Sequence, residues 1–307
     1  MPPTPISYWI GFHVALLVLL AGELVYARRQ ARLGRSPRRT ALAATALWIV
    51  AALALAGFIQ HGFGSAASVQ YLAGYAVEES LSIDNLFVFL LLFRLFQITP
   101  AHQPKVLFWG VAGAVVLRGL FIAGGLTLLD HFGWVTYLFA AFLLVAAARL
   151  LVPEEPGDTA TAPRWILWLT RLHPVSARQD RFVVREDGRI MATMLLLALV
   201  AIELSDVVFA LDSIPAVLSI TRHSFLAYTS NILAVMGLRS LYTLLIGALS
   251  RLRFLHYGLA AVLAFAALKM LASHWIEVGP IASLGIILAL LAITLVASLC
   301  APVRRAS

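Results

Sequence analysis

Nine stretches of mostly apolar residues, each about 20 residues long or slightly longer, dominate the sequence. A helix of about 20 residues crosses the roughly 30 Å of hydrocarbon in a bilayer. The alternating apolar and polar pattern of an outer-membrane barrel is absent. The pattern therefore predicts an all-α polytopic membrane protein, one membrane domain over residues 1–307, with about nine spans at 8–27, 41–60, 67–93, 106–128, 132–150, 191–219, 225–249, 256–275 and 281–300.

The composition supports this class of protein. Of 307 residues, 61% are hydrophobic and only 12% are charged, which is more apolar surface than a water-soluble globule of this length can bury. These values exclude a cytosolic enzyme, a secreted disulfide scaffold and a disordered chain, and we expect no enzymatic activity. Cys300 is the single cysteine, so an internal disulfide or a cysteine-cluster metal site is excluded.

The positive charges predict the orientation. Most of the 23 Lys and Arg residues lie in loops that nine crossings place on one side of the membrane. Because cytoplasmic loops are enriched in Lys and Arg, we expect the N-terminus outside and the C-terminus in the cytoplasm. The net charge of +8 is thus a topology signal, and we expect no nucleic-acid partner. The first span has its arginines after it, which favours a retained helix over a cleaved signal peptide.

Residues 151–190 form the single long loop, which this orientation places in the cytoplasm. Within it, residues 181–185 are followed by Glu186-Asp187-Gly188, and Asp-Gly favours a tight primed turn. Two interpretations stay open, a small β-hairpin and a basic loop on the membrane surface.

Ionisable residues inside the spans carry the functional information, because each costs roughly 2.5–3.5 kcal/mol at the bilayer centre even on the most lenient scale. In span 67–93, helical spacing places Glu78, Ser82 and Asn85 on one stripe and Asp84 on the adjoining side. The same spacing directs the side chain of Glu79 away from this stripe.

Span 191–219 carries a second polar cluster. Glu203, Asp206 and Ser213 share one face, whereas Asp212 falls on the far side of a straight helix. Pro215 removes a backbone donor. We expect a bend or an unwound turn there that swings Asp212 inward and frees carbonyl oxygens.

Two arginines within spans accompany these acids. Arg118 follows the first cluster and Arg239 follows the second at nearly the same spacing, and we expect them to hold carboxylates or to replace a departing cation. The spans enter from opposite sides, which predicts two inverted units, 67–150 and 191–275, as in many secondary transporters. Glu23 and Lys269 lie toward span ends, where we expect them to extend to the interface.

The acids outnumber the arginines within the spans. A buried carboxylate without a partner must protonate or bind a cation, so the surplus predicts a cation or proton pathway. Every candidate ligand in the two clusters is an oxygen, which suits Mg²⁺, Ca²⁺ and Mn²⁺ better than Zn²⁺ or Cu⁺. The residues alone lead to a hard divalent cation or H⁺.

At these motifs the chain resembles the TerC/Alx family of bacterial inner-membrane proteins. The resemblance spans roughly residues 70–275 and rests on residues 78–89, 115–118, 181–185, 203–216 and 229–239. It implies a multi-pass protein of the bacterial inner membrane that exports Mn²⁺, from a family associated with tellurium resistance and, in its Alx branch, with alkaline-induced expression. The positions carried over as metal-pathway candidates are Glu79, Asp84, Asn85, Glu203, Asp206, Asp212 and Ser213.

The leading hypothesis is therefore a secondary transporter exporting Mn²⁺, with H⁺ as the candidate counter-ion and no permanently bound cofactor. The alternatives are a proton-handling protein and a membrane scaffold with protein partners in a tellurium or alkaline stress response. An intramembrane aspartyl protease is disfavoured because its Gly-x-Gly-Asp signature is absent.

Overall fold

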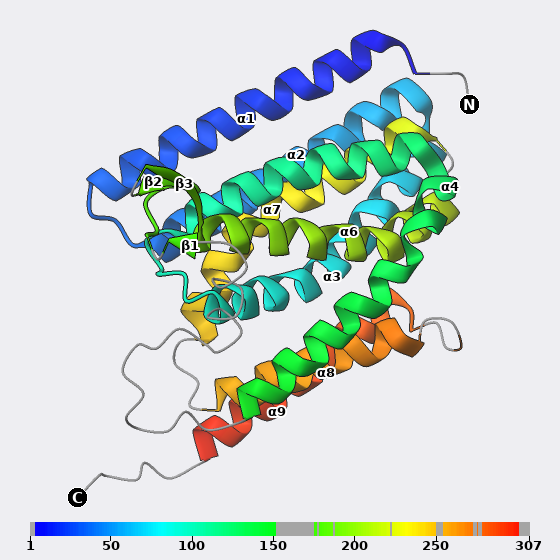
Figure 1. Cartoon of the computed structure of the whole chain (residues 1–307). Helices are drawn as coiled ribbons and strands as arrows, with labels where there is room; N and C mark the ends of the chain where they lie inside the picture. Colours follow the sequence, from blue (N-terminus) through cyan, green and yellow to red (C-terminus); the bar gives the residue numbers. More distant parts are fainter. Residues whose placement is uncertain are drawn as a thin grey trace, which may run out of the picture.

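The computed structural model describes residues 4–151, 175–176, 178–186, 188–221, 223–249, 254–272, 275 and 278–300. Within these ranges the chain is mainly helical (Figure 1). The helices are α1 (Ile6–Arg32), α2 (Pro37–Phe63), α3 (Ser65–Leu95), α4 (Gln103–Leu151), α6 (Met194–Ile220), α7 (Ser224–Leu249), α8 (Leu255–Ala272) and α9 (Pro280–Cys300).

Two of these helices form the centre of the molecule. In α3 every residue from Leu86 to Phe93 is buried, and in α7 every residue from Phe225 to Leu238 is buried. A helix that is buried on all sides is surrounded by other helices. By contrast, α1 lies at the edge of the bundle (Figure 1) and exposes apolar side chains along its length. In a membrane protein these side chains face lipid.

The structure of α4 differs from the prediction at one span boundary, between residues 128 and 132. The sequence predicts separate spans at 106–128 and 132–150, whereas the structure assigns one helix over 49 residues. Figure 1 shows that its two halves run in different directions and that the second half lies with α8 and α9. The expected reversal of direction is therefore a bend within helical backbone. The sequence between the two spans, Leu129-Asp130-His131, contains no proline to end the helix.

Helix α6 corrects a second expectation. It is helical without interruption from Met194 to Ile220, so the unwound turn expected at Pro215 is not present. A proline within a helix removes one hydrogen bond, but neighbouring helices allow membrane helices to tolerate this. The side chains of Pro215 and Asp212 lie outside the described part of the structure.

A small sheet forms in the last part of the predicted long loop and in the residues just after it. Strands β1 (Val175–Ser176), β2 (Val183–Glu186) and β3 (Arg189–Thr193) are arranged in the order β1-β3-β2, with β2 and β3 antiparallel. Gly188 in the connecting turn has a φ of 76°, a left-handed conformation that glycine adopts without strain. Of the two interpretations of this segment, the hairpin is the one that forms.

The segment between β1 and β2 contacts the first turn of α4 and the loop that precedes this helix. Lys105 donates to the backbone oxygen of Asp180 over 2.6 Å, and the Gln179 amide both donates to the backbone oxygen of Gln97 and accepts from the backbone of Thr99. Next to this contact, the Arg178 guanidinium holds the pKa of the Asp180 carboxyl below its usual value. The pair therefore stays charged at neutral pH.

The ends of the bundle are distinct. Figure 1 shows the start of α1 at one end and the sheet, together with the end of α9, at the other. Within the described residues, four helical segments are long and apolar enough to cross a membrane by length and composition: Ile6–Arg32, Pro37–Phe63, Gln103–Gly124 and Ser224–Gly247. Two shorter apolar helices, Tyr257–Ala272 and Gly285–Ser298, add to the membrane character of the chain.

Candidate functional site

The centre of the site is the guanidinium of Arg118 on α4. It donates to both carboxylate oxygens of Asp206 on α6, from Nε over 3.2 Å and from Nη2 over 2.7 Å. Its Nη1 also contacts Glu78 on α3 and donates to the Asn231 amide oxygen on α7 over 2.7 Å. One side chain thus joins four helices.

Asn231 completes this network. Its Nδ2 donates to the second carboxylate oxygen of Glu78 over 2.8 Å. All four residues of the network, Arg118, Glu78, Asn231 and Asp206, are buried. The sequence gives one signal for Asn231, an amide in the middle of an apolar span, within a string that we used for the family resemblance without assigning a role to this residue.

The charges of the network do not cancel. Two carboxylates, those of Glu78 and Asp206, share the single guanidinium of Arg118, which leaves one negative charge in a buried position. Removing charges from water costs several kcal/mol per ion, and only well-placed partners compensate this. A proton or a further cation can balance a carboxylate buried in this way.

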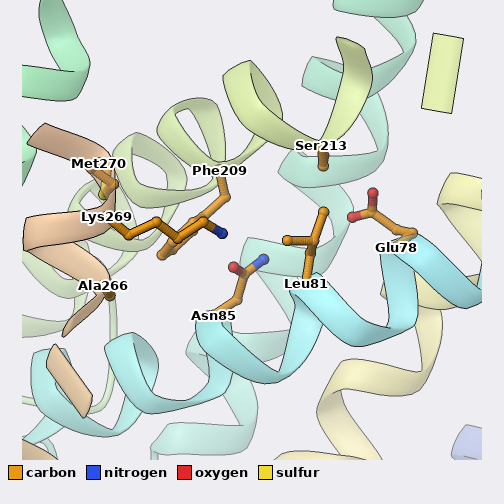
Figure 2. A pocket seen from close by; sticks show the side chains of 8 residues that line it. All are labelled: Glu78, Leu81, Asn85, Phe209, Ser213, Ala266, Lys269 and Met270. Atoms are coloured by element: carbon orange, nitrogen blue, oxygen red, sulfur yellow. The ribbon is translucent and has the colours of Figure 1, made fainter. Parts of the chain in front are cut away.

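A small cavity lies beside the network (Figure 2). Its volume is about 10 Å³, which is room for one water-sized particle. Its lining side chains come from α3, α6 and α8 (Figure 2). The polar lining consists of Glu78 and Asn85 on α3, Ser213 on α6 and Lys269 on α8.

Several buried oxygens at these helices have no hydrogen-bond partner among the described residues. They include the Asn85 amide oxygen and the Ser213 hydroxyl, both on the cavity wall, and the Ser82 hydroxyl on the same stripe of α3. As the helical spacing predicts, Glu78, Ser82 and Asn85 are all buried. An unpartnered buried oxygen is costly, so these groups are suited to hold a cation or water.

Glu203 and Glu79 lie apart from this cavity. Glu203 on α6 places its carboxylate against Gly113 of α4, where any side chain would collide with it. One carboxylate oxygen of Glu203 and one of Glu79 are buried without a hydrogen-bond partner within the described parts of the chain. Of the adjacent acids in α3, Glu78 lines the cavity and Glu79 does not.

Some sequence-based candidates are not tested. The side chains of Asp84 and Asp212, like that of Pro215, lie outside the described part of the structure, although α3 and α6 include their positions. Among the side chains that are described, no group of three His, Cys, Asp or Glu residues comes together as a metal site.

The partner of Arg239, the second arginine within a predicted span, differs from the expectation. Arg239 on α7 pairs with Glu23 on α1, not with an acid of either cluster among the described residues. Glu23 is buried, and it also accepts a hydrogen bond from the Trp48 indole over 3.1 Å. The expected extension of Glu23 to the membrane interface is therefore wrong, because the carboxylate finds two partners inside the bundle.

Long apolar helices around a buried charged network define a multi-pass helical membrane protein. The family comparison specifies it further: the model described as integral membrane protein TerC family matches residues 63–306. The chain belongs to the TerC family. No solved structure gives a significant match to it.

Relatives match over most of this chain. A membrane protein of Myxococcus xanthus, uncharacterized by its name, is 37% identical over 293 residues, covering 95% of this chain and 91% of that protein. The putative membrane-bound redox modulator Alx of Escherichia coli K12 is 36% identical over 299 residues, covering 94% and 92%. The chloroplastic thylakoid membrane protein TERC of Arabidopsis thaliana is 42% identical over 233 residues, covering 75% and 60%.

Proposed function

We propose that this protein exports a hard divalent cation, Mn²⁺ in particular, from bacterial cells across the inner membrane, with H⁺ as the exchanged ion. The observation that carries the proposal is the pair of buried carboxylates, Glu78 and Asp206, that share one guanidinium beside a water-sized cavity. Unpartnered oxygens of Asn85 and Ser213 line the same cavity. A cation entering there gains oxygen ligands and neutralises the remaining negative charge.

The donor chemistry supports a hard ion. Carboxylate, amide and hydroxyl oxygens suit Mg²⁺, Ca²⁺ and Mn²⁺, which take several oxygen ligands. The choice of Mn²⁺ among these ions rests on the family resemblance. Some relatives carry the name redox modulator. This chain has a single cysteine and so no internal dithiol, and in our proposal a redox effect comes through the exported metal.

The residues have distinct roles in this proposal. Glu78, Asn85 and Ser213 contact the ion in the cavity, and Arg118 fixes the carboxylates of Glu78 and Asp206 in place. Glu79 and Glu203 are further carboxylates along the ion's path, and Asp84 and Asp212 remain candidates from the sequence. Arg239 and Glu23 tie α1 to α7 and have no role in ion binding.

The test is Mn²⁺ uptake into inverted membrane vesicles, in which export appears as uptake. We expect Asp206→Asn to reduce the initial rate at least about tenfold, because it removes the surplus negative charge that attracts the ion. Ser213→Ala removes one neutral ligand and leaves the ion pairs intact. We expect a smaller reduction, by about threefold to tenfold.

Asp180→Asn is the matched control, since it makes the same chemical change at an exposed carboxylate between β1 and β2. It should transport at the wild-type rate. Vesicles with equal amounts of folded protein, measured by size-exclusion chromatography after extraction, are compared. Equal Mn²⁺ uptake by wild type, Asp206→Asn and vesicles without the protein would contradict the proposal.

The two alternatives give different results in the same vesicles. A proton-only transporter changes the internal pH, read with a fluorescent dye, by the same amount with and without Mn²⁺. A scaffold gives no flux of either ion. Our proposal requires proton movement that depends on Mn²⁺.

A further inference from the structure

Lys269 occupies a position that the sequence did not predict. We expected its side chain to extend to the interface from the end of a span. Instead it lines the cavity beside Asn85, Ser213 and Glu78, and Figure 2 shows its amine directed into the space between Phe209 and Asn85. Lys269 is half-buried in the last turn of α8, so its long side chain reaches both the cavity and its outer edge.

The chemistry of the ammonium complements the cavity. It has three donors and no acceptor, whereas the Asn85 amide oxygen and the Ser213 hydroxyl are buried acceptors without a donor. Lys269 forms no ion pair with any carboxylate whose side chain the structure describes. Among the described side chains, no carboxylate therefore neutralises the charge of Lys269.

Arg118 differs from Lys269 in this respect. Its guanidinium is held by Asp206, Glu78 and Asn231 together, so its movement would leave the carboxylates of Glu78 and Asp206 without their cationic partner. A fixed planar guanidinium is suited to a structural role, while a single charge on a flexible four-carbon chain is suited to one that moves.

We infer that Lys269 is a tethered cation that competes with the transported metal ion for the cavity lined by Glu78, Asn85 and Ser213. With its ammonium in the cavity, the surplus negative charge is neutralised and the site is closed to a metal. When a metal ion enters, the lysine withdraws toward the edge. This inference rests on the proposed function, because it names what replaces the ion after its release.

The test is Mn²⁺ binding to the purified full chain in detergent, measured by loss of the electron paramagnetic resonance signal of free Mn²⁺. Lys269→Met keeps most of the side-chain length and removes the charge. We expect it to bind Mn²⁺ at least about tenfold more tightly than wild type, since a nearby positive charge no longer repels the ion. Lys269→Arg keeps the charge and should not tighten binding.

Lys105→Met is the matched control, because Lys105 is the other lysine of the chain and contacts Asp180 and Phe182, between β1 and β2. It changes the net charge equally and should bind Mn²⁺ within about twofold of wild type. Lys269→Gln, a second neutral variant, replaces Lys269→Met if the latter elutes as aggregate.

The outcomes separate the two proposals. Wild type that binds Mn²⁺ with the same affinity as both neutral Lys269 variants would overturn the role of Lys269 and leave the proposed function standing. If neither wild type nor the neutral variants bind Mn²⁺, the proposed cargo is wrong as well. Tighter binding confined to the neutral Lys269 variants supports both.

Discussion

At the scale of single residues, Arg118 binds three buried side chains at once, those of Asp206, Glu78 and Asn231. A buried charge without a partner is far more costly than a buried neutral group, so each member of the network depends on the others. The network also connects α3, α4, α6 and α7 at one point. A change at Arg118 should therefore affect folding before it affects any transport step.

We expect Arg118→Met to destabilise the protein by about 3–5 kcal/mol, because Glu78 and Asp206 would remain buried and unpaired. This is a large part of a typical folding free energy of about 5–15 kcal/mol. The readout is the thermal unfolding midpoint in detergent, with the recovered monodisperse fraction as a second measure.

The triple variant Glu78→Gln, Arg118→Met, Asp206→Asn tests the cause. It removes every charge of the network together, so most of the lost stability should return even though transport is abolished. Arg239→Met is a milder comparison, since Arg239 holds one carboxylate and its side chain is 17% exposed. An Arg118→Met protein that unfolds at the wild-type temperature would contradict this account.

Sequence spacing predicts burial at this scale, but not the choice of partner. The stripe of Glu78, Ser82 and Asn85 is buried as expected because helical periodicity depends only on local geometry. The contacts of Arg118 with Asn231 and of Arg239 with Glu23 join residues more than 100 positions apart. Such pairs depend on how the helices pack, which periodicity does not determine.

At the scale of elements, two glycines set the approach of α4 to α6. A side chain at Gly113 would collide with the Glu203 carboxylate, and one at Gly110 would meet the Ile202 side chain at 2.9 Å. Small residues at such contacts allow membrane helices to approach closely. The position of the Glu203 carboxylate is therefore a consequence of the missing side chain at Gly113.

We expect Gly113→Ala to destabilise the protein by about 1–3 kcal/mol, because the methyl group must displace the Glu203 carboxylate from a packed interface. In a Glu203→Ala background most of this cost should disappear, and a double-mutant cycle of unfolding midpoints measures the difference. Gly57→Ala in α2, where a side chain meets nothing within 4 Å, is the control and should be neutral or slightly stabilising. Additive effects of the two changes would refute the contact.

The sequence predicted where the helices lie, but it wrongly predicted a helix end near residue 128, within α4. Apolar length predicted a helix at each helix that the structure describes, and the Asp187-Gly188 pair predicted the hairpin between β2 and β3. The change of direction within α4 had no proline to mark it, and the second half of this helix lies with α8 (Figure 1). Local signals end helices reliably only where the sequence contains them.

At the scale of the whole molecule, the two units expected from the sequence contact each other at the Arg118 guanidinium. Glu78 and Arg118 belong to the first unit, and Asp206 and Asn231 belong to the second. The ion pairing is not symmetric, since Arg239 pairs with Glu23, which precedes both units and the residues matched by the family model. The inverted arrangement itself stays a prediction from the sequence.

Orientation in the membrane is the prediction that depends on the whole chain. The excess of Lys and Arg predicts that the sheet lies in the cytoplasm and the junction of α2 and α3 outside. With Cys300 replaced by serine, single cysteines at Ser65 and at Ile190 report on these two ends, because both positions are exposed.

A membrane-impermeant maleimide added to intact spheroplasts should label Ser65→Cys and spare Ile190→Cys. Inverted vesicles should give the opposite pattern, and detergent-solubilised protein, in which both cysteines react, provides the maximum signal. Labelling of both positions from the same side would refute the predicted orientation. It would also remove the basis for interpreting uptake into inverted vesicles as export, because the direction of transport in that assay is defined by which end of the bundle faces the medium.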